Sequence, residues 1–277
     1  MQNTISIQGG PASFHDIATQ QFCGDAPRLY CEDFPRTFEA LSTGEADLAV
    51  VAIENSLYGS INPVYDLILK HQFAIVGEVY LRIEQCLIGL PGAQLADATS
   101  VYSHPVAIAQ CEDFLDNNLS QTDRHEYQDT ADSVLHIKQL GDTRNLAIAS
   151  RQAAERYGLE VLAESIETNK ENYTRFVVLA KQSSLQDNAP STKTSLVITT
   201  NHQPGALYNA LGSFAKRSIN LNKIQSRPIV GKAWHYMFYV DVNIGSAEGD
   251  FVAARADLEA QGCTVTVLGS YLSGTPV

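Results

Sequence analysis

The sequence lacks most of the features that mark secreted, membrane-spanning or metal-binding proteins. Its five cysteines are an odd number and contain no C-x-x-C pair, which argues against a disulfide framework and against a zinc site. No apolar run is long enough to cross a bilayer. The opening residues, MQNTISIQGGPASF, show neither the basic segment nor the apolar stretch of a signal peptide. From the cysteines we therefore expect a cytoplasmic protein without a disulfide framework or a zinc site.

Positive charge is scarce as well. The 277 residues include 19 Lys and Arg against 31 Asp and Glu, which gives a formal net charge of −12. Such a balance argues against nucleic acid and against an anionic membrane surface as partners. An acidic protein can still bind a small anion through backbone amides at helix N-termini or through a single well-placed arginine. The length is enough for two domains.

The second half of the chain follows a polar, aperiodic stretch, KQSSLQDNAPSTK, which predicts a linker over residues 182–193. Beyond it the patterns alternate as strand, helix, strand, strand, helix and strand, with TSLVITT first and CTVTVLGSYL last. This order predicts a ferredoxin-like βαββαβ domain over residues 194–277. The remaining residues, 1–181, alternate strands with helices and predict an α/β domain. Its strands are expected at 4–8, 47–53, 75–80, 99–103, 145–149 and 174–180.

Several helices of the first domain begin directly after a strand. Asn62 before a proline, Thr130 and Ser150 are expected N-caps, and Pro105 opens another helix. In α/β sheets, helix N-termini at the carboxyl ends of strands bind anionic ligands. Every α/β protein also needs such caps for its helices, so the caps alone do not establish a ligand site.

Two polar stretches next to apolar strands point more strongly to a site. The loop ENSLYGS crowds five polar side chains after the strand DLAVVAI, more than a turn needs. The stretch ENYTRFVVLAK begins a buried strand with Asn172, Thr174 and Arg175. These polar groups either cap the strand or face a cleft and bind a substrate.

Taken together, the motifs of the chain resemble the prephenate dehydratase family with a C-terminal ACT regulatory domain. The resemblance rests on collinear stretches through both halves: GGPASF, IENSLYGSI, YSHPVAIAQC, DTADSV, AIASRQAAERYGLEVL, NYTRFVVLAK, KTSL, PGAL, IQSRP, FYVDV and VLGSYL. It implies a two-lobed, periplasmic-binding-protein-like α/β catalytic domain. It also implies loss of carbon dioxide and a ring hydroxyl from prephenate to give phenylpyruvate, without a cofactor, in phenylalanine biosynthesis.

The resemblance implies a set of site residues. Thr174, Arg175 and Asn172 are the implied catalytic residues. The implied substrate-binding residues are Ser13, Glu54, Asn55, Ser56, Ser60, His104, Gln110, Thr130 and Phe176.

Strand geometry restricts the roles of two of these residues. Successive strand residues point to opposite faces, so Thr174 and Arg175 do not both face the cleft in a regular strand. We expect Thr174 to face it as a hydrogen-bond donor to the departing hydroxyl, and Arg175 to pair with an internal carboxylate such as Glu54. His104 is either a general acid or, as we favour from its place before Pro105, a helix cap. Phe176 is also consistent with a core position.

For the second domain, the resemblance implies a phenylalanine-binding site and side-by-side pairing into a homodimer or homotetramer. The implied contacts are Gly205, Ala206, Leu207, Gln225, Ser226, Arg227 and Pro228. Gln225 stands where the family usually has glutamate, which removes a charge from this site. The alternative is a domain that only dimerises.

Two other functions stay open from the residues alone. Arogenate, which carries an ammonium in place of the keto group, is an alternative substrate, and Asp132 of DTADSV is a candidate partner for that ammonium. A non-catalytic amino-acid-binding sensor with the same two-lobed fold is the other alternative.

Overall fold

The computed structural model describes residues 3–182, 191–201, 203–229, 231–244 and 248–274. By its internal contacts the chain divides into two compact units. The first comprises Met1–Leu67 and Val79–Val177, and the second Ile68–Glu78 and Val178–Gly274. Most of the expected linker lies outside the described residues. The boundaries 1–181, 182–193 and 194–277 stay a prediction.

The first sheet has six strands in the order β2-β1-β3-β11-β5, with the short β4 paired to β3. Strands β1, β2 and β3 are parallel, while β4 returns antiparallel beside the end of β3. The core of β3 is apolar and buried on both faces, as expected of a central strand that is covered on both sides. The elements are β1 (Ile5–Gln8), α1 (Phe14–Cys23), β2 (Arg28–Cys31), α2 (Phe34–Thr43), β3 (Leu48–Asn55), β4 (Gly59–Ser60), α3 (Asn62–His71), β5 (Ala74–Arg82) and β11 (Tyr173–Ala180).

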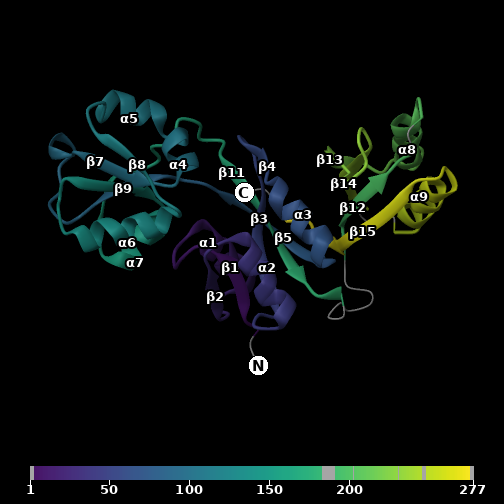
Figure 1. Ribbon diagram of the computed structural model, residues 1–277, viewed down its shortest axis with the longest axis horizontal. Helices are drawn as coiled ribbons and strands as arrows, with labels where there is room; N and C mark the ends of the chain where they lie inside the picture. Colours follow the sequence, from purple (N-terminus) through teal and green to yellow (C-terminus); the bar gives the residue numbers. More distant parts are fainter. Residues whose placement is uncertain (1–2, 183–190, 202, 230, 245–247, 275–277) are drawn as a thin grey trace. The chain divides into compact units, whose positions relative to one another are not determined.

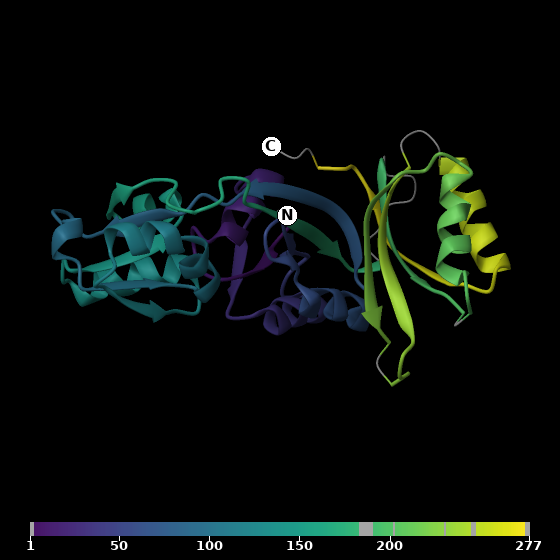
Figure 2. The ribbon, with the colours of Figure 1, turned by 90° about the horizontal axis from the view of Figure 1, so that it is seen from above.

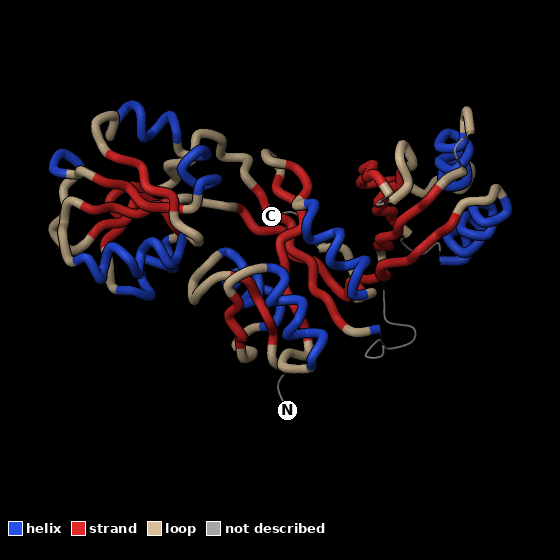
Figure 3. The backbone as a smooth tube through the Cα atoms, viewed as in Figure 1, coloured by secondary structure: helices blue, strands red, loops and turns tan. Residues whose placement is uncertain are grey.

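The second sheet has five strands in the order β10-β6-β9-β7-β8 and forms the teal lobe of Figure 1. Helices cover both of its faces (Figure 3). One core cluster gathers apolar residues of α6 and α7, and the other those of α4 and α5. The elements are β6 (Cys86–Gly89), the 3₁₀ helix η1 (Leu95–Asp97), β7 (Ser100–Ser103), α4 (Pro105–Gln110), α5 (Glu112–Asn118), β8 (Asp123–Glu126), α6 (Thr130–Leu140), β9 (Asn145–Ala149), α7 (Arg151–Tyr157) and β10 (Glu160–Ala163).

The third sheet has four antiparallel strands in the order β13-β14-β12-β15. Its two helices lie on one face of the sheet (Figure 2), and their apolar residues form one core with it. The chain order is βαββαβ, which confirms the ferredoxin-like prediction. The elements are β12 (Lys193–Thr199), α8 (Ala206–Ala215), β13 (Leu221–Pro228), β14 (Tyr236–Asn243), α9 (Glu248–Ala260) and β15 (Thr264–Tyr271).

The six strands expected in the first domain correspond to β1, β3, β5, β7, β9 and β11, each within two residues at either end. The α/β fold class with a ferredoxin-like second part is thereby confirmed. Two expected helix starts need correction. Asp129, and not Thr130, is the N-cap of α6, and α3 already includes Asn62 as its first residue. Ser150 does cap α7, where its side chain accepts a hydrogen bond from the Ala153 N–H.

Within the described part of the chain, no helix combines the length and the apolar composition needed to cross a bilayer. In that same part, no group of three or more His, Cys, Asp or Glu residues is arranged to hold a metal ion. All five cysteines are free thiols. Cys111 is fully buried in the core that α4 and α5 share with the second sheet, and burial raises the pKa of its thiol. A buried, protonated thiol has the properties of a small core residue.

Candidate active site

A cavity of about 420 Å³ lies within the first compact unit, between residues of its two α/β lobes. Seven of the residues expected at a substrate site line it: Asn55, Ser60, His104, Gln110, Thr130, Thr174 and Phe176. The remaining lining residues are Gln8, Phe14, His15, Phe34, Ala52, Tyr58, Gly59, Ile61, Ile83, Gln85, Val106, Ala107, Gln128 and Asp129. None of these described lining residues is a lysine or an arginine, so any anion in the cavity depends on uncharged donors.

The alternation of β11 decides which of its polar residues reach the cavity. Thr174 and Phe176 both line it, as residues two apart on one face of a strand should. Arg175 between them is buried, and its Nη1 lies 4.0 Å from Glu54 Oε2. The predicted pairing of Arg175 with Glu54 therefore agrees with the structure. Arg175 and Glu54 are not among the residues that line the cavity, unlike the roles that the resemblance implied for them.

Asn55 joins the end of β3 to the start of β11. Its Nδ2 donates to Asn172 Oδ1 at 2.8 Å, to the Tyr173 carbonyl at 3.2 Å and to Thr174 Oγ1 at 3.0 Å. Because the Thr174 oxygen accepts this bond, its own hydrogen remains as a donor. Asn172 is fully buried and absent from the lining, so its place is behind Thr174.

Ser56 and Ser13 also have structural partners and are absent from the lining. Ser56 Oγ accepts from the Tyr173 N–H and donates to the Glu171 carbonyl, each at 2.9 Å. Ser13 is buried and caps α1 by accepting from the Asp16 N–H. The expectation that these two hydroxyls line the substrate cavity is not met, because both form hydrogen bonds with backbone groups instead.

The second lobe contributes His104, Gln110 and Thr130 to the cavity. His104 caps α4, with its Nδ1 accepting from the Val106 N–H at 3.2 Å, which is the capping role favoured from the sequence. Burial lowers the pKa of His104. Gln110 ends α4, and its Oε1 accepts from Gln85 Nε2 at 3.3 Å. These residues offer neutral donors and acceptors rather than charges.

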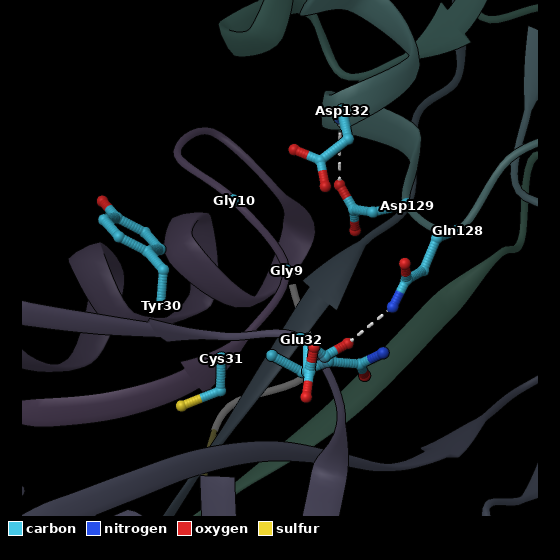
Figure 4. Close-up of a pocket in the computed structure, with 9 residues that line it drawn as sticks. Gly9, Gly10, Tyr30, Cys31, Glu32, Gln128, Asp129 and Asp132 are labelled. Carbon is cyan, nitrogen blue, oxygen red and sulfur yellow. Dashed lines mark hydrogen bonds between the residues drawn. The ribbon is translucent and has the colours of Figure 1, made fainter. Parts of the chain in front are cut away.

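Two carboxylates lie beside the glycine loop that follows β1. Figure 4 shows Asp129 and Asp132 at the start of α6, with Gly9 and Gly10 next to them. A Cβ atom on Gly9 would lie 2.8 Å from Asp129 Oδ2, and one on Gly10 would lie 2.6 Å from Asp132 Oδ1. Gly9 also has a φ of 87°, in the region that favours glycine. The two glycines of GGPASF thus allow the carboxylates of the second lobe to approach the first.

Burial, followed by the charge of Asp132, raises the pKa of Asp129 from 3.8 to about 6. Between these values the unfolded carboxyl has lost its proton while the folded one keeps it, so the free energy of unfolding falls as pH rises. Asparagine caps helices as well as aspartate does. We therefore expect Asp129→Asn to raise the free energy of unfolding by about 2 kcal/mol at neutral pH.

Urea unfolding of both proteins across the pH range measures this effect. The gain should vanish below pH 3.8, where the carboxyl is protonated in both states. A wild-type protein that is more stable than Asp129→Asn above pH 6 would contradict the raised pKa of the folded Asp129 carboxyl.

Two polar residues of the cavity, the half-buried His15 and the buried Gln85, were not predicted from the sequence. His15 lies in the first turn of α1, where burial lowers its pKa to about 4. Gln85 follows β5 and is buried, with its N–H donating to Glu167 Oε2 at 2.9 Å. The partner of His15 in space is Ala52, which lies 37 positions away in the chain. Only the presence of an ionisable side chain next to GGPASF marked His15 in the sequence.

The residues expected to bind phenylalanine lie on two elements of the second unit. Gly205 precedes α8 with a φ of 79°, and Ala206 and Leu207 open that helix. The other four, Gln225, Ser226, Arg227 and Pro228, form the end of β13. Because β13 is the first strand in the sheet order, this segment lies at a sheet edge.

Two α/β lobes around a small cavity lined by polar and apolar side chains, followed by a βαββαβ domain, define a class of protein that binds a small molecule and carries an additional small domain. Comparison with known proteins makes this more specific, since a family model described as prephenate dehydratase matches residues 5–184. The chain belongs to the prephenate dehydratase family. Its second unit has the fold of an ACT domain, and the chain is a dehydratase of aromatic amino acid biosynthesis.

Three similar proteins illustrate this relationship. Arogenate dehydratase/prephenate dehydratase 1 of Arabidopsis thaliana is 37% identical over 281 residues, covering 96% of this chain and 71% of that protein. A solved prephenate dehydratase from Arthrobacter aurescens in complex with L-Phe is 32% identical, with a TM-score of 0.86 over 97% of this chain and 89% of that one. A solved structure named GqqA, a novel type of quorum quenching acylase, is 33% identical, with a TM-score of 0.86 over 97% of each chain.

The expected cytoplasmic location is wrong on this comparison. Relatives from Arabidopsis thaliana that match this chain carry a chloroplast location in their names. The expectation had relied on unpaired cysteines. These indicate only a reducing environment and do not distinguish one reducing compartment from another.

Proposed function

We propose that the protein converts prephenate to phenylpyruvate by decarboxylative dehydration. The ring carboxylate leaves as carbon dioxide, and its bonding electrons complete the aromatic ring as the C4–O bond breaks. The departing oxygen takes up one proton and leaves as water. The reaction therefore needs a donor at the hydroxyl and a cavity that positions the substrate and excludes water, without a group that accepts electrons.

The position of the Thr174 hydroxyl supports this proposal more than any other observation. Its oxygen accepts a hydrogen bond from Asn55 at the wall of the cavity, so its hydrogen can donate to a group bound there. We assign that acceptor as the departing hydroxyl oxygen. The hydroxyl of threonine is too weakly acidic to protonate it outright, so Thr174 stabilises the charge that develops on this oxygen.

Asn172, Asn55 and Arg175 hold Thr174 in place in this proposal. Asn172 and Asn55 form one hydrogen-bonded group behind Thr174, while Arg175 and Glu54 pair next to it in the chain. Substrate contacts would come from Ser60, His104, Gln110, Thr130 and Phe176, which line the cavity. All of these contacts are uncharged donors, acceptors or apolar groups at neutral pH, because burial lowers the pKa of His104.

A second candidate substrate is arogenate, because Asp129 contributes a carboxylate to the cavity wall. An ionised Asp129 would attract the ammonium group of arogenate, and a protonated one would favour the neutral keto group of prephenate. Asp129, rather than Asp132, is the carboxylate of the DTADSV region that lines this cavity. Relatives named for arogenate dehydratase activity also favour this alternative.

The acylase activity that the name of GqqA gives for that protein is less well supported for this chain. A hydroxyl nucleophile needs a base that takes its proton. The side chain that contacts Thr174 Oγ1 is the amide of Asn55, which acts as a donor and is no base.

For the second unit, we propose that it binds phenylalanine as an effector and pairs with a second copy of the chain. A solved prephenate dehydratase similar to this chain is a complex with L-Phe. In this proposal the effector contacts are Gly205, Ala206, Leu207, Gln225, Ser226, Arg227 and Pro228. The sheet edge at β13 would carry the pairing of protomers into a homodimer or homotetramer, which also covers the edge.

The test compares prephenate and arogenate as substrates of the purified protein, with and without phenylalanine. The proposal predicts a larger kcat/KM for prephenate and inhibition by phenylalanine. A larger kcat/KM for arogenate would show that arogenate, and not prephenate, is the preferred substrate. Turnover that phenylalanine leaves unchanged would refute the effector role. Binding of phenylalanine without any turnover would indicate a non-catalytic sensor.

A further inference from the structure

His15 lies among aromatic rings at the side of the cavity next to Phe176. Its ring meets that of Phe176 edge to face at a centroid distance of 5.0 Å, and that of Phe34 at 5.8 Å. Thr174 and Phe176 are two apart on β11, so their Cα atoms are about 7 Å apart along the strand. His15 therefore lines the cavity beside Phe176, and Thr174 lines it about 7 Å further along β11.

The hydrogen bonds of His15 determine which of its nitrogens carries the proton. Nε2 accepts from the Ala52 N–H at 3.1 Å. A neutral imidazole has one acceptor and one donor nitrogen, so the proton is on Nδ1. Burial lowers the pKa of His15 to about 4, which keeps the ring neutral near pH 7. Within the described ranges, no group of the protein accepts a hydrogen bond from Nδ1.

The charge requirements of the reaction favour a neutral donor at this position. The substrate has two carboxylates, of which the ring carboxylate is lost and the side-chain carboxylate is unchanged. A cation near both would stabilise the ring carboxylate in the ground state and so raise the barrier to its loss. A neutral N–H with a fixed direction can hold the side-chain carboxylate without this penalty.

Resting on the proposed function, we propose that His15 Nδ1–H donates to the side-chain carboxylate of the substrate. The leaving hydroxyl and the carbon that bears the side chain are at opposite ends of the substrate ring. With Thr174 at the hydroxyl, the side chain reaches toward Phe176 and His15. The same carboxylate is present in prephenate, arogenate and phenylpyruvate, so the role of His15 is independent of the choice between the two substrates.

Two variants distinguish the roles of the two ring nitrogens of His15. In His15→Gln the side-chain oxygen can take the place of Nε2 and accept from the Ala52 N–H, but the donor at Nδ1 is lost. In His15→Asn the side-chain NH₂ can take the place of Nδ1, but the Ala52 N–H loses its acceptor. The first variant should impair substrate binding and the second should impair stability.

Steady-state kinetics and thermal unfolding of both variants test this inference. We expect His15→Gln to raise KM, and the inhibition constant of the product phenylpyruvate, by about 10- to 100-fold, with kcat changed less than about threefold. His15→Asn, which keeps a donor, should raise both constants less than His15→Gln does and unfold at a lower temperature than His15→Gln. A packing role alone would produce no such opposite pattern.

Other outcomes overturn the inference. Unchanged KM in His15→Gln would show that Nδ1 does not contact the substrate. A raised KM with an unchanged phenylpyruvate constant would assign the contact to the ring carboxylate instead. A loss confined to kcat would place His15 at the leaving group. If the wild type converts neither prephenate nor arogenate, the proposed function itself fails, which is visible before any variant is made.

Discussion

Replacing Thr174 by valine is expected to lower kcat with prephenate by about 10²- to 10³-fold, the usual cost of removing one hydrogen-bond donor that stabilises developing charge. Valine keeps the shape and removes the hydroxyl. Asn55 Nδ2 still has acceptors in Asn172 Oδ1 and the Tyr173 carbonyl, so the start of β11 should keep its position. Because substrate contacts elsewhere in the cavity are unchanged, KM should change little.

Thr174→Ser is the matched control, since it keeps the hydroxyl and removes one methyl group. We expect it to retain kcat within about tenfold of the wild type. Unfolding curves of both variants would show that neither loses the fold. Wild-type kcat in Thr174→Val would show that the hydroxyl of Thr174 takes no part in the departure of the ring oxygen.

The largest expected effect on stability comes from a buried ion pair in the second unit. Lys193 Nζ lies 3.1 Å and 2.9 Å from the two carboxylate oxygens of Glu78, and both side chains are buried. Glu78 Oε1 also accepts from Ser273 Oγ at 3.2 Å and from the Gly274 N–H at 3.0 Å. Lys193→Met leaves the Glu78 carboxylate without its cation and is expected to lower the free energy of unfolding by about 3–5 kcal/mol.

Two further proteins serve as controls in urea unfolding. The double variant Glu78→Gln/Lys193→Met removes both charges and should recover most of the loss, since no unpaired charge remains buried. Lys216→Met changes an exposed lysine of the same unit and should alter stability by less than about 0.5 kcal/mol. A Lys193→Met protein as stable as Lys216→Met would contradict the importance of the pair.

Much of the fold was predictable because its core strands have local patterns. The buried strand at β11 and the βαββαβ order of the second part follow from apolar alternation and turn residues. The strands that sequence reasoning missed in the first unit are β2, β4, β6, β8 and β10, each of four residues or fewer. All four residues of β8, DRHE, are exposed, so this strand has no apolar face that a pattern could reveal.

The site residues were predictable where a single strand determines which way they point, but not where segments far apart in the chain meet. Strand alternation separated Thr174 from Arg175, and charge pairing suggested Glu54. His15 depends on Ala52 and Phe176, which only the folded chain brings next to it. Lys193 looked like the end of a polar linker, because its partner Glu78 is 115 positions away. Ser13 and Ser56 lie in polar stretches that are typical of a binding site, but their hydroxyls form hydrogen bonds with backbone groups.

The central claim is that this cavity catalyses decarboxylative dehydration through the hydroxyl of Thr174. The most direct test measures carbon dioxide and phenylpyruvate released from prephenate by the wild type and by Thr174→Val under the same conditions. We predict equal amounts of both products from the wild type and release from Thr174→Val at least about 100-fold slower. Equal rates from the two proteins, or no phenylpyruvate from the wild type, would contradict it.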